Sequence, residues 1–129
     1  MSIENIIKEK GDYYCTGGVS EEVIKNAEVS LGVKFAKDYI NYLEKFGRVT
    51  FGSHEITGLY DGKRLDVVKV TLEEKDMYDE EITDMYVVEM LNIDGICIWQ
   101  NSKGEVFQMA PHISKELIAN SFEEYILES

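Results

Sequence analysis

The first half of the chain carries apolar residues at helical spacing. A helix over residues 20–31 is predicted, because apolar side chains recur every fourth position after Ser20, a typical N-cap, and Gly32 follows as a typical left-handed stop. A second helix over 36–46 is predicted by an apolar face that ends before Gly47 and consists of Tyr39, Ile40, Leu43 and Phe46. We expect these faces to hold a helical layer together and against a sheet.

Beyond residue 48 the spacing changes to that of strands. Short strands are expected over 49–52 and 54–59. The segment 65–76 fits a helix or a strand on its pattern alone, and a helix is the preferred interpretation.

The last third of the chain has the pattern of an antiparallel meander. Strands are predicted over 85–91, 96–100 and 105–109. Asp94-Gly95 and the segment 101–104 between them are typical hairpin turns. We expect the meander to end at Pro111 and a short amphipathic helix over 121–127 to close the chain.

Length and composition are those of one globular domain. The chain has 129 residues, of which 44% are hydrophobic, and a single proline. We therefore expect one α+β domain over residues 1–129, with an antiparallel β-sheet and helices packed against it. The first residues, MSIENIIKEKG, are typical of an amphipathic helix rather than a signal peptide, and no apolar run approaches the ~20 residues that cross a bilayer. A soluble, cytoplasmic protein with no membrane association is the expectation.

The distribution of charge is uneven. The net charge is −12, and residues 65–94 hold ten acidic against two basic residues. Seven acids and one lysine fall within the twelve residues 73–84. Phosphate binding requires clustered Lys and Arg side chains, so no direct contact with nucleic acid is expected. A basic protein is the natural partner for this composition.

The acidic segment and its aromatic neighbours are the candidate partner-binding site. The candidate residues are Glu73, Glu74, Asp76, Tyr78, Asp79, Glu80, Glu81, Asp84 and Tyr86. A plain solvated face is an equally weighted alternative. The segment lacks the Asp-x-Asp-x-Asp-Gly order of a calcium loop, so neither a metal nor another cofactor is expected.

Catalysis finds little support among the residues that usually perform it. His54 and His112 belong to no metal-binding or catalytic motif. Cys15 and Cys97 have no CxxC spacing and are expected to be reduced and packed, although a Cys–His pair formed in space remains an alternative. Trp99 is expected in the core. The chain is therefore predicted not to be an enzyme.

Several segments resemble the SUKH superfamily, the Smi/Knr type. The specific part is TGGVSEEVIKNAEVSLGVKFAKDYINYLEKFG followed by FGSHEITGL, between Gly17 and Leu59. Weaker similarity continues through LDVVKVT, ICIWQNSKGEVFQM and SFEEYI. Family members usually place a proline before the Asp-Tyr helix, where this chain has Ala36.

The resemblance implies a SUKH-like α+β fold and a binding function. Many bacterial members are immunity proteins, which neutralise a toxin encoded beside them, often a nuclease. The leading hypothesis is an immunity protein, or antitoxin, whose acidic surface occludes a basic nuclease domain stoichiometrically. The alternative is a regulatory or scaffolding protein-interaction module outside a toxin system, and a small-molecule enzyme ranks third. The oligomeric state is left open.

Overall fold

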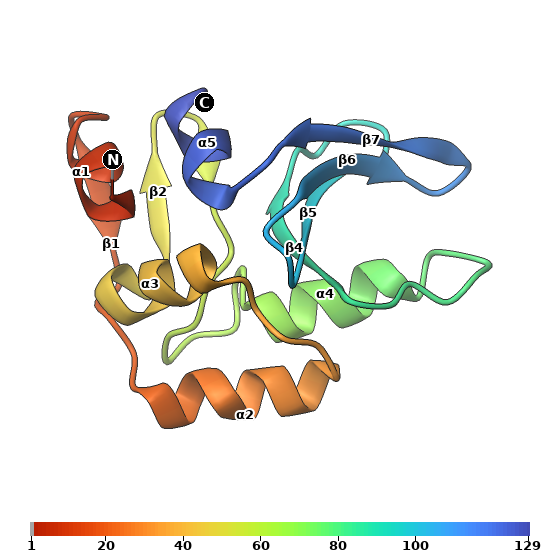
Figure 1. Cartoon of the computed structure of the whole chain (residues 1–129), viewed down its shortest axis with the longest axis horizontal. Coiled ribbons are helices and arrows are strands. Elements are labelled where there is room, and N and C mark those ends of the chain that lie inside the picture. Colours follow the sequence, from red (N-terminus) through yellow and green to blue (C-terminus); the bar gives the residue numbers. More distant parts are fainter. Residues whose placement is uncertain (1) are drawn as a thin grey trace.

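The computed structural model describes residues 2–129, which form five helices and seven strands (Figure 1). The helices are α1 (Ile3–Lys8), α2 (Glu21–Leu31), α3 (Lys37–Phe46), α4 (Val67–Lys75) and α5 (Phe122–Leu127). The strands are β1 (Tyr13–Cys15), β2 (Val49–Phe51), β3 (His54–Glu55), β4 (Met85–Met90), β5 (Cys97–Asn101), β6 (Val106–Ala110) and β7 (Ile113–Ala119). No helix within this described part is long and apolar enough to cross a membrane.

All strand pairs are antiparallel, and they form two sheets. The smaller sheet has the order β1-β2-β3, and the larger has the order β4-β5-β6-β7. The α+β class and the antiparallel meander are confirmed, since β4, β5 and β6 follow the predicted strands within one residue at each end.

The meander is one strand longer than the sequence pattern predicted. Pro111 ends β6, but Pro111 and His112 form a turn and β7 continues the sheet. Five of the seven residues of β7 are exposed, so the strand has no alternation of apolar and polar residues by which it could be found. The three-residue β1 was missed because it is too short to show a period.

The predicted helices are confirmed, and their capping explains their bounds. Ser20 Oγ accepts the N–H of Val23 at 3.3 Å, and Gly32 ends α2 with φ 67°. The segment 65–76, which fitted a helix or a strand on its pattern, contains helix α4. The helix begins there because Asp66 Oδ1 accepts the N–H groups of Val68 and Lys69. The Ser20 and Asp66 side chains satisfy backbone donors that a helix leaves unpaired at its start, and the N–H of Gly32 pairs with the carbonyls of Glu28 and Val29 at the end of α2.

The Asp-Tyr pair at the start of α3 holds α3 and α5 together. Asp38 Oδ2 accepts the N–H groups of Phe122 and Glu123 at 2.7 and 3.3 Å, which ties the start of α5 to α3. The Tyr39 ring packs edge-on against Phe122, with 5.3 Å between ring centroids. This motif therefore serves the fold.

The two faces of the larger sheet pack into different cores. The main core lies between α1, α2, α3 and α5 and the sheets, and it includes Tyr39, Leu43, Val88, Ile98 and Phe122. The second core, on the opposite face of the larger sheet, consists of Val70, Met85, Val87, Cys97, Trp99, Phe107 and Met109. Trp99 is fully buried there, which confirms it as a core residue.

Thr57 connects the smaller sheet to the larger one. Its N–H donates to Val88 O at 2.9 Å, and its hydroxyl donates to Val87 O at 2.8 Å. Its carbonyl accepts the hydroxyl of Tyr42 at 2.8 Å. The expected strand over 54–59 is therefore shorter than predicted: it ends at Glu55, because the residues after it are buried and bond across to β4.

Candidate interaction surface

The acidic loop, residues 76–84, connects α4 to β4 and projects from the end of the molecule opposite α1 (Figure 1). Its acidic side chains are all exposed: Asp76, Asp79, Glu80, Glu81 and Asp84. None of the seven acids of residues 73–84 forms an ion pair within 4.0 Å with a cation of residues 2–129. Their charge is therefore available to an external partner.

Two apolar side chains hold the acidic loop on the sheet. Tyr78 and Ile82 are half-buried and pack against the second core. The Tyr78 ring meets Trp99 edge-on at 5.9 Å between centroids. Burial is the main reason that the pKa of Tyr78 rises to about 12, with smaller contributions from the neighbouring Cys97 and Glu74. The loop is thus anchored at its middle while its carboxylates point to solvent.

Three of the other predicted contact residues have different environments. Glu73 is exposed on α4, whereas Glu74 is half-buried. Glu74 Oε1 accepts a hydrogen bond from Cys97 Sγ at 3.3 Å. Asp84 accepts the hydroxyl of Ser102 at 2.9 Å and has a left-handed backbone, with φ 56°. Glu74 and Asp84 therefore also fix the ends of the loop.

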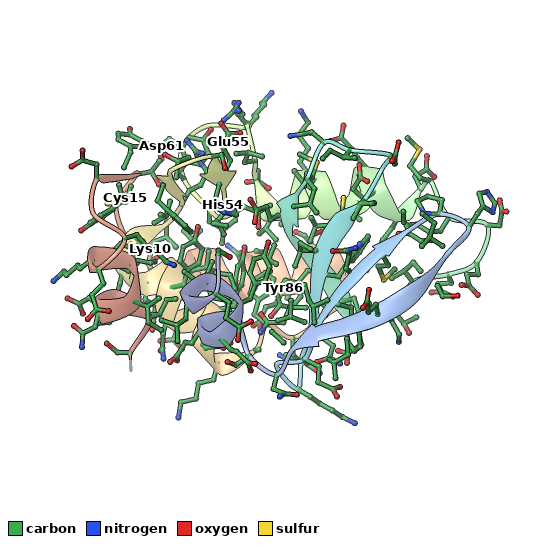
Figure 2. All side chains as sticks on the ribbon, turned by 90° about the horizontal axis from the view of Figure 1, so that it is seen from above. Lys10, Cys15, His54, Glu55, Asp61 and Tyr86 are labelled. Atoms are coloured by element: carbon green, nitrogen blue, oxygen red, sulfur yellow. The ribbon has the colours of Figure 1, made fainter. Side chains whose placement is uncertain are left out.

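Tyr86 does not belong to this surface, and its prediction as a contact residue is corrected. It is fully buried on the face of β4 that looks into the main core (Figure 2). Its hydroxyl donates to Gln100 Oε1 at 2.7 Å and accepts the N–H of Ala36 at 2.8 Å. Side chains alternate along a strand, so Tyr86 points away from the side of its neighbour Met85.

A groove separates the acidic loop from the hairpin of β6 and β7. One part of it, about 340 Å³, has Glu80 and Glu81 on one side and Ile113 and Lys115 on the other. An adjoining part of about 290 Å³ runs from Asp79 and Glu80 to Pro111 and His112, and Tyr78 lines both. The hairpin side of this groove was not predicted, because β7 itself was missed.

The candidate catalytic residues do not come together. Cys15 pairs with Val49 on β2, whereas His54 lies on β3 and pairs with Phe51. Cys15 and His54 are therefore about 12 Å apart, two strand spacings across the sheet and two residues along it, beyond hydrogen-bond reach. Cys97 is buried, which raises the pKa of its thiol, and the charge of Glu74 raises it further. The two thiols are free, and Cys97 is packed as expected.

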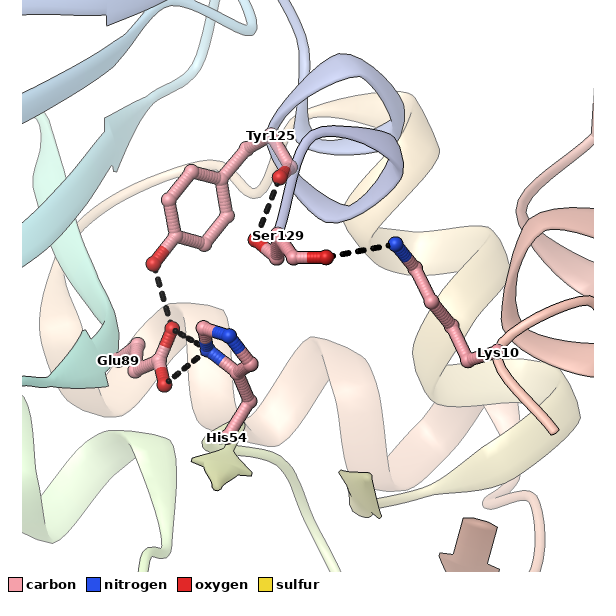
Figure 3. A network of polar contacts seen from close by, with 5 residues as sticks. All are labelled: Lys10, His54, Glu89, Tyr125 and Ser129. Atoms are coloured by element: carbon pink, nitrogen blue, oxygen red, sulfur yellow. Dashed lines mark hydrogen bonds and ion pairs between the residues drawn. The ribbon is translucent and has the colours of Figure 1, made fainter. Parts of the chain in front are cut away.

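His54 belongs instead to a polar network that joins three elements (Figure 3). Its Nδ1 lies 3.0 Å from Glu89 Oε2 on β4, and the Tyr125 hydroxyl of α5 donates to the same carboxylate. Lys10 Nζ donates to Ser129 O at 2.8 Å beside it. These contacts hold β3 and α5 against β4. Residues 2–129 contain no cluster of three or more His, Cys, Asp or Glu suited to a metal ion.

The chain matches a known protein family. The sequence model of the family SUKH_5, described as SMI1-KNR4 cell-wall, matches residues 2–129. No curated protein matches the chain.

Proposed function

Because this chain belongs to the SUKH_5 family of SMI1-KNR4 proteins, we propose that it is an immunity protein that binds and neutralises a basic toxin domain, a nuclease, through its acidic loop. Membership supports an immunity-type function through binding of a partner protein, generally without catalysis. The exposed and unpaired carboxylates of the acidic loop are the observation that carries the finer proposal.

The direction of α4 argues that these charges are more than a solvated face. A helix C-terminus carries a partial negative charge, so acids there destabilise the helix, by about 0.3–1 kcal/mol each at low ionic strength. Helix α4 has Glu73 and Glu74 in its last turn and Asp76 at its C-cap. Helix α2 shows the favourable arrangement, with Glu21 and Glu22 in its first turn. The acids of α4 are placed against the stability of the helix, which favours a role in binding.

Inhibition by this surface requires occupation and no chemistry. A nuclease site must be positively charged to hold phosphates, and an array of carboxylates is complementary to the same cations. Unpaired charges also increase the rate of encounter with an oppositely charged surface. Once docked, the anchored loop excludes the nucleic acid sterically, and the toxin remains inactive for the lifetime of the complex.

The test is the association rate of the purified chain with the toxin domain encoded beside it, measured against ionic strength. The variant Asp79→Asn, Glu80→Gln, Glu81→Gln is expected to associate about tenfold more slowly at low salt and to show a weaker salt dependence. Its stability changes little, because exposed charges contribute little to folding.

A matched control removes the same charge elsewhere. Three exposed acids without an ion pair in residues 2–129 lie away from the acidic loop (Figure 1): Glu9 at the end of α1, Glu22 on α2 and Glu44 on α3. Their triple Gln variant is expected to associate nearly as fast as the wild type. Equal slowing by both triples would attribute the effect to net charge alone. An absence of any complex would contradict the proposed function.

A further inference from the structure

Strand β7 presents an open edge. It lies last in the order β4-β5-β6-β7 and pairs only with β6 within residues 2–129. Its side chains are exposed from Ile113 to Leu117, with Ile113 55% and Leu117 50% accessible. An edge strand has unpaired backbone N–H and C=O groups along its outer side, which can pair with another extended chain.

This open edge begins at the acidic groove. Ile113, Ser114 and Lys115 form one side of the groove of about 340 Å³, and Glu80 and Glu81 form the other. The Lys115 ammonium lies over the Phe107 ring, 4.6 Å from its centroid, so this cation is held against its own sheet. Backbone pairing groups, apolar side chains and unpaired carboxylates thus occur side by side.

We propose that β7 receives an extended, cationic segment of the partner, which pairs with its free edge and directs Lys or Arg side chains to Glu80 and Glu81. Main-chain hydrogen bonds to β7 provide affinity, and alternate side chains reach Ile113, Leu117 or the carboxylates. This proposal rests on the proposed function and specifies how the partner docks.

Charge decides between this occupant and a second copy of the chain. A copy would bring another net charge of −12 to a face that already holds Asp79, Glu80 and Glu81. Like charges brought together disfavour association, whereas a cationic segment neutralises them. Strand β1, an edge strand of the smaller sheet, has only three residues and is at the opposite end of the molecule from the acidic loop (Figure 1). It serves as an internal control.

The test uses two capped peptides of about eight residues, the length of a strand, and needs no toxin. One alternates Arg and Val, and the other alternates Glu and Val. Backbone amide NMR spectra of the full chain are expected to show saturable changes at residues 113–117 and 80–81 with the Arg peptide only. Amides of β1 should not respond. Unchanged β7 amides, or an equal response to both peptides, would overturn the proposal.

Matched substitutions test the position of the edge. Leu117→Lys adds a like charge where the Arg peptide would bind and is expected to weaken its binding about tenfold. Leu127→Lys makes the same change on α5 at 49% exposure and should leave binding unchanged. Ile113→Lys repeats the test should Leu117→Lys fold poorly. Equal affinities for the variants at β7 and α5 would contradict docking at this edge.

Two further results separate this inference from the proposed function. A toxin complex in which β7 gains no protection from hydrogen exchange would refute edge pairing and leave the immunity function standing. Peptide binding at β7 without any toxin complex would support edge pairing and refute the immunity function. Concentration-dependent dimers that protect β7 in the absence of peptide would assign the edge to a second copy and overturn the proposal.

Discussion

At the scale of single residues, hydrogen bonds separate structural aromatic side chains from those that a partner can reach. The Tyr86 hydroxyl has two buried partners, the N–H of Ala36 and the side chain of Gln100. Tyr78 lies in the same stretch of sequence but lines the groove. Proximity in sequence to an acidic segment therefore says little about accessibility, because both faces of β4 are buried in the two cores, whereas Tyr78 lies in the loop before the strand.

Tyr86→Phe tests this distinction. We expect the free energy of unfolding to fall by about 1–3 kcal/mol, because the variant leaves a buried N–H and a buried amide oxygen unpaired. The association rate with the toxin should not change. Urea unfolding and stopped-flow binding measure the two effects. Tyr14→Phe, at 62% exposure, is the control and should alter neither quantity. Slower association without a loss of stability would return Tyr86 to the interface.

At the scale of elements, α4 has three acids at its C-terminal end, Glu73, Glu74 and Asp76, against its own dipole and beside one favourable base, Lys75. Asp76→Asn removes an exposed anion from the C-cap, so we expect a gain of about 0.3–1 kcal/mol in the free energy of unfolding at low ionic strength. The same variant should associate with the toxin more slowly. Stability and binding thus change in opposite directions.

Glu22→Gln is the opposite test, made at the start of α2. This acid lies in the first turn, where the dipole favours it, so its removal should lower stability by a similar amount and leave association unchanged. Thermal unfolding at low and high salt measures both variants, and the differences should shrink as salt screens the charges. If Asp76→Asn were destabilising, the acids of α4 would have a structural role that the helix dipole does not describe.

At the scale of the whole molecule, the two sheets are joined through Thr57 and the network around Glu89. We expect one cooperative unfolding transition, because separation of the sheets would leave the buried hydroxyl of Thr57 and the carboxylate of Glu89 without partners. Trp99, the only tryptophan, reports on the second core by fluorescence, and far-ultraviolet circular dichroism reports mainly on the helices. Coincident urea transitions would support a single domain, and two separated transitions would contradict it.

Elements whose stability is local could be predicted from the sequence. Helices α2 and α3 and the first three strands of the meander were predictable, because their caps, turns and apolar periods involve residues close together in the chain. Exposure of the charges at Asp79, Glu80 and Glu81 was predictable as well, since unpaired carboxylates stay in water.

The side of the groove opposite those charges could not be predicted from the sequence. Strand β7 is held by pairing with β6 rather than by a buried face, so its residues carry no period that could identify it. The burial of Tyr86 depends on Ala36 and Gln100, which are distant in sequence. The groove exists because the acidic loop and the β6–β7 hairpin fold to the same end of the molecule. Such contacts depend on which segments meet in space, and local propensity contains no information about that choice.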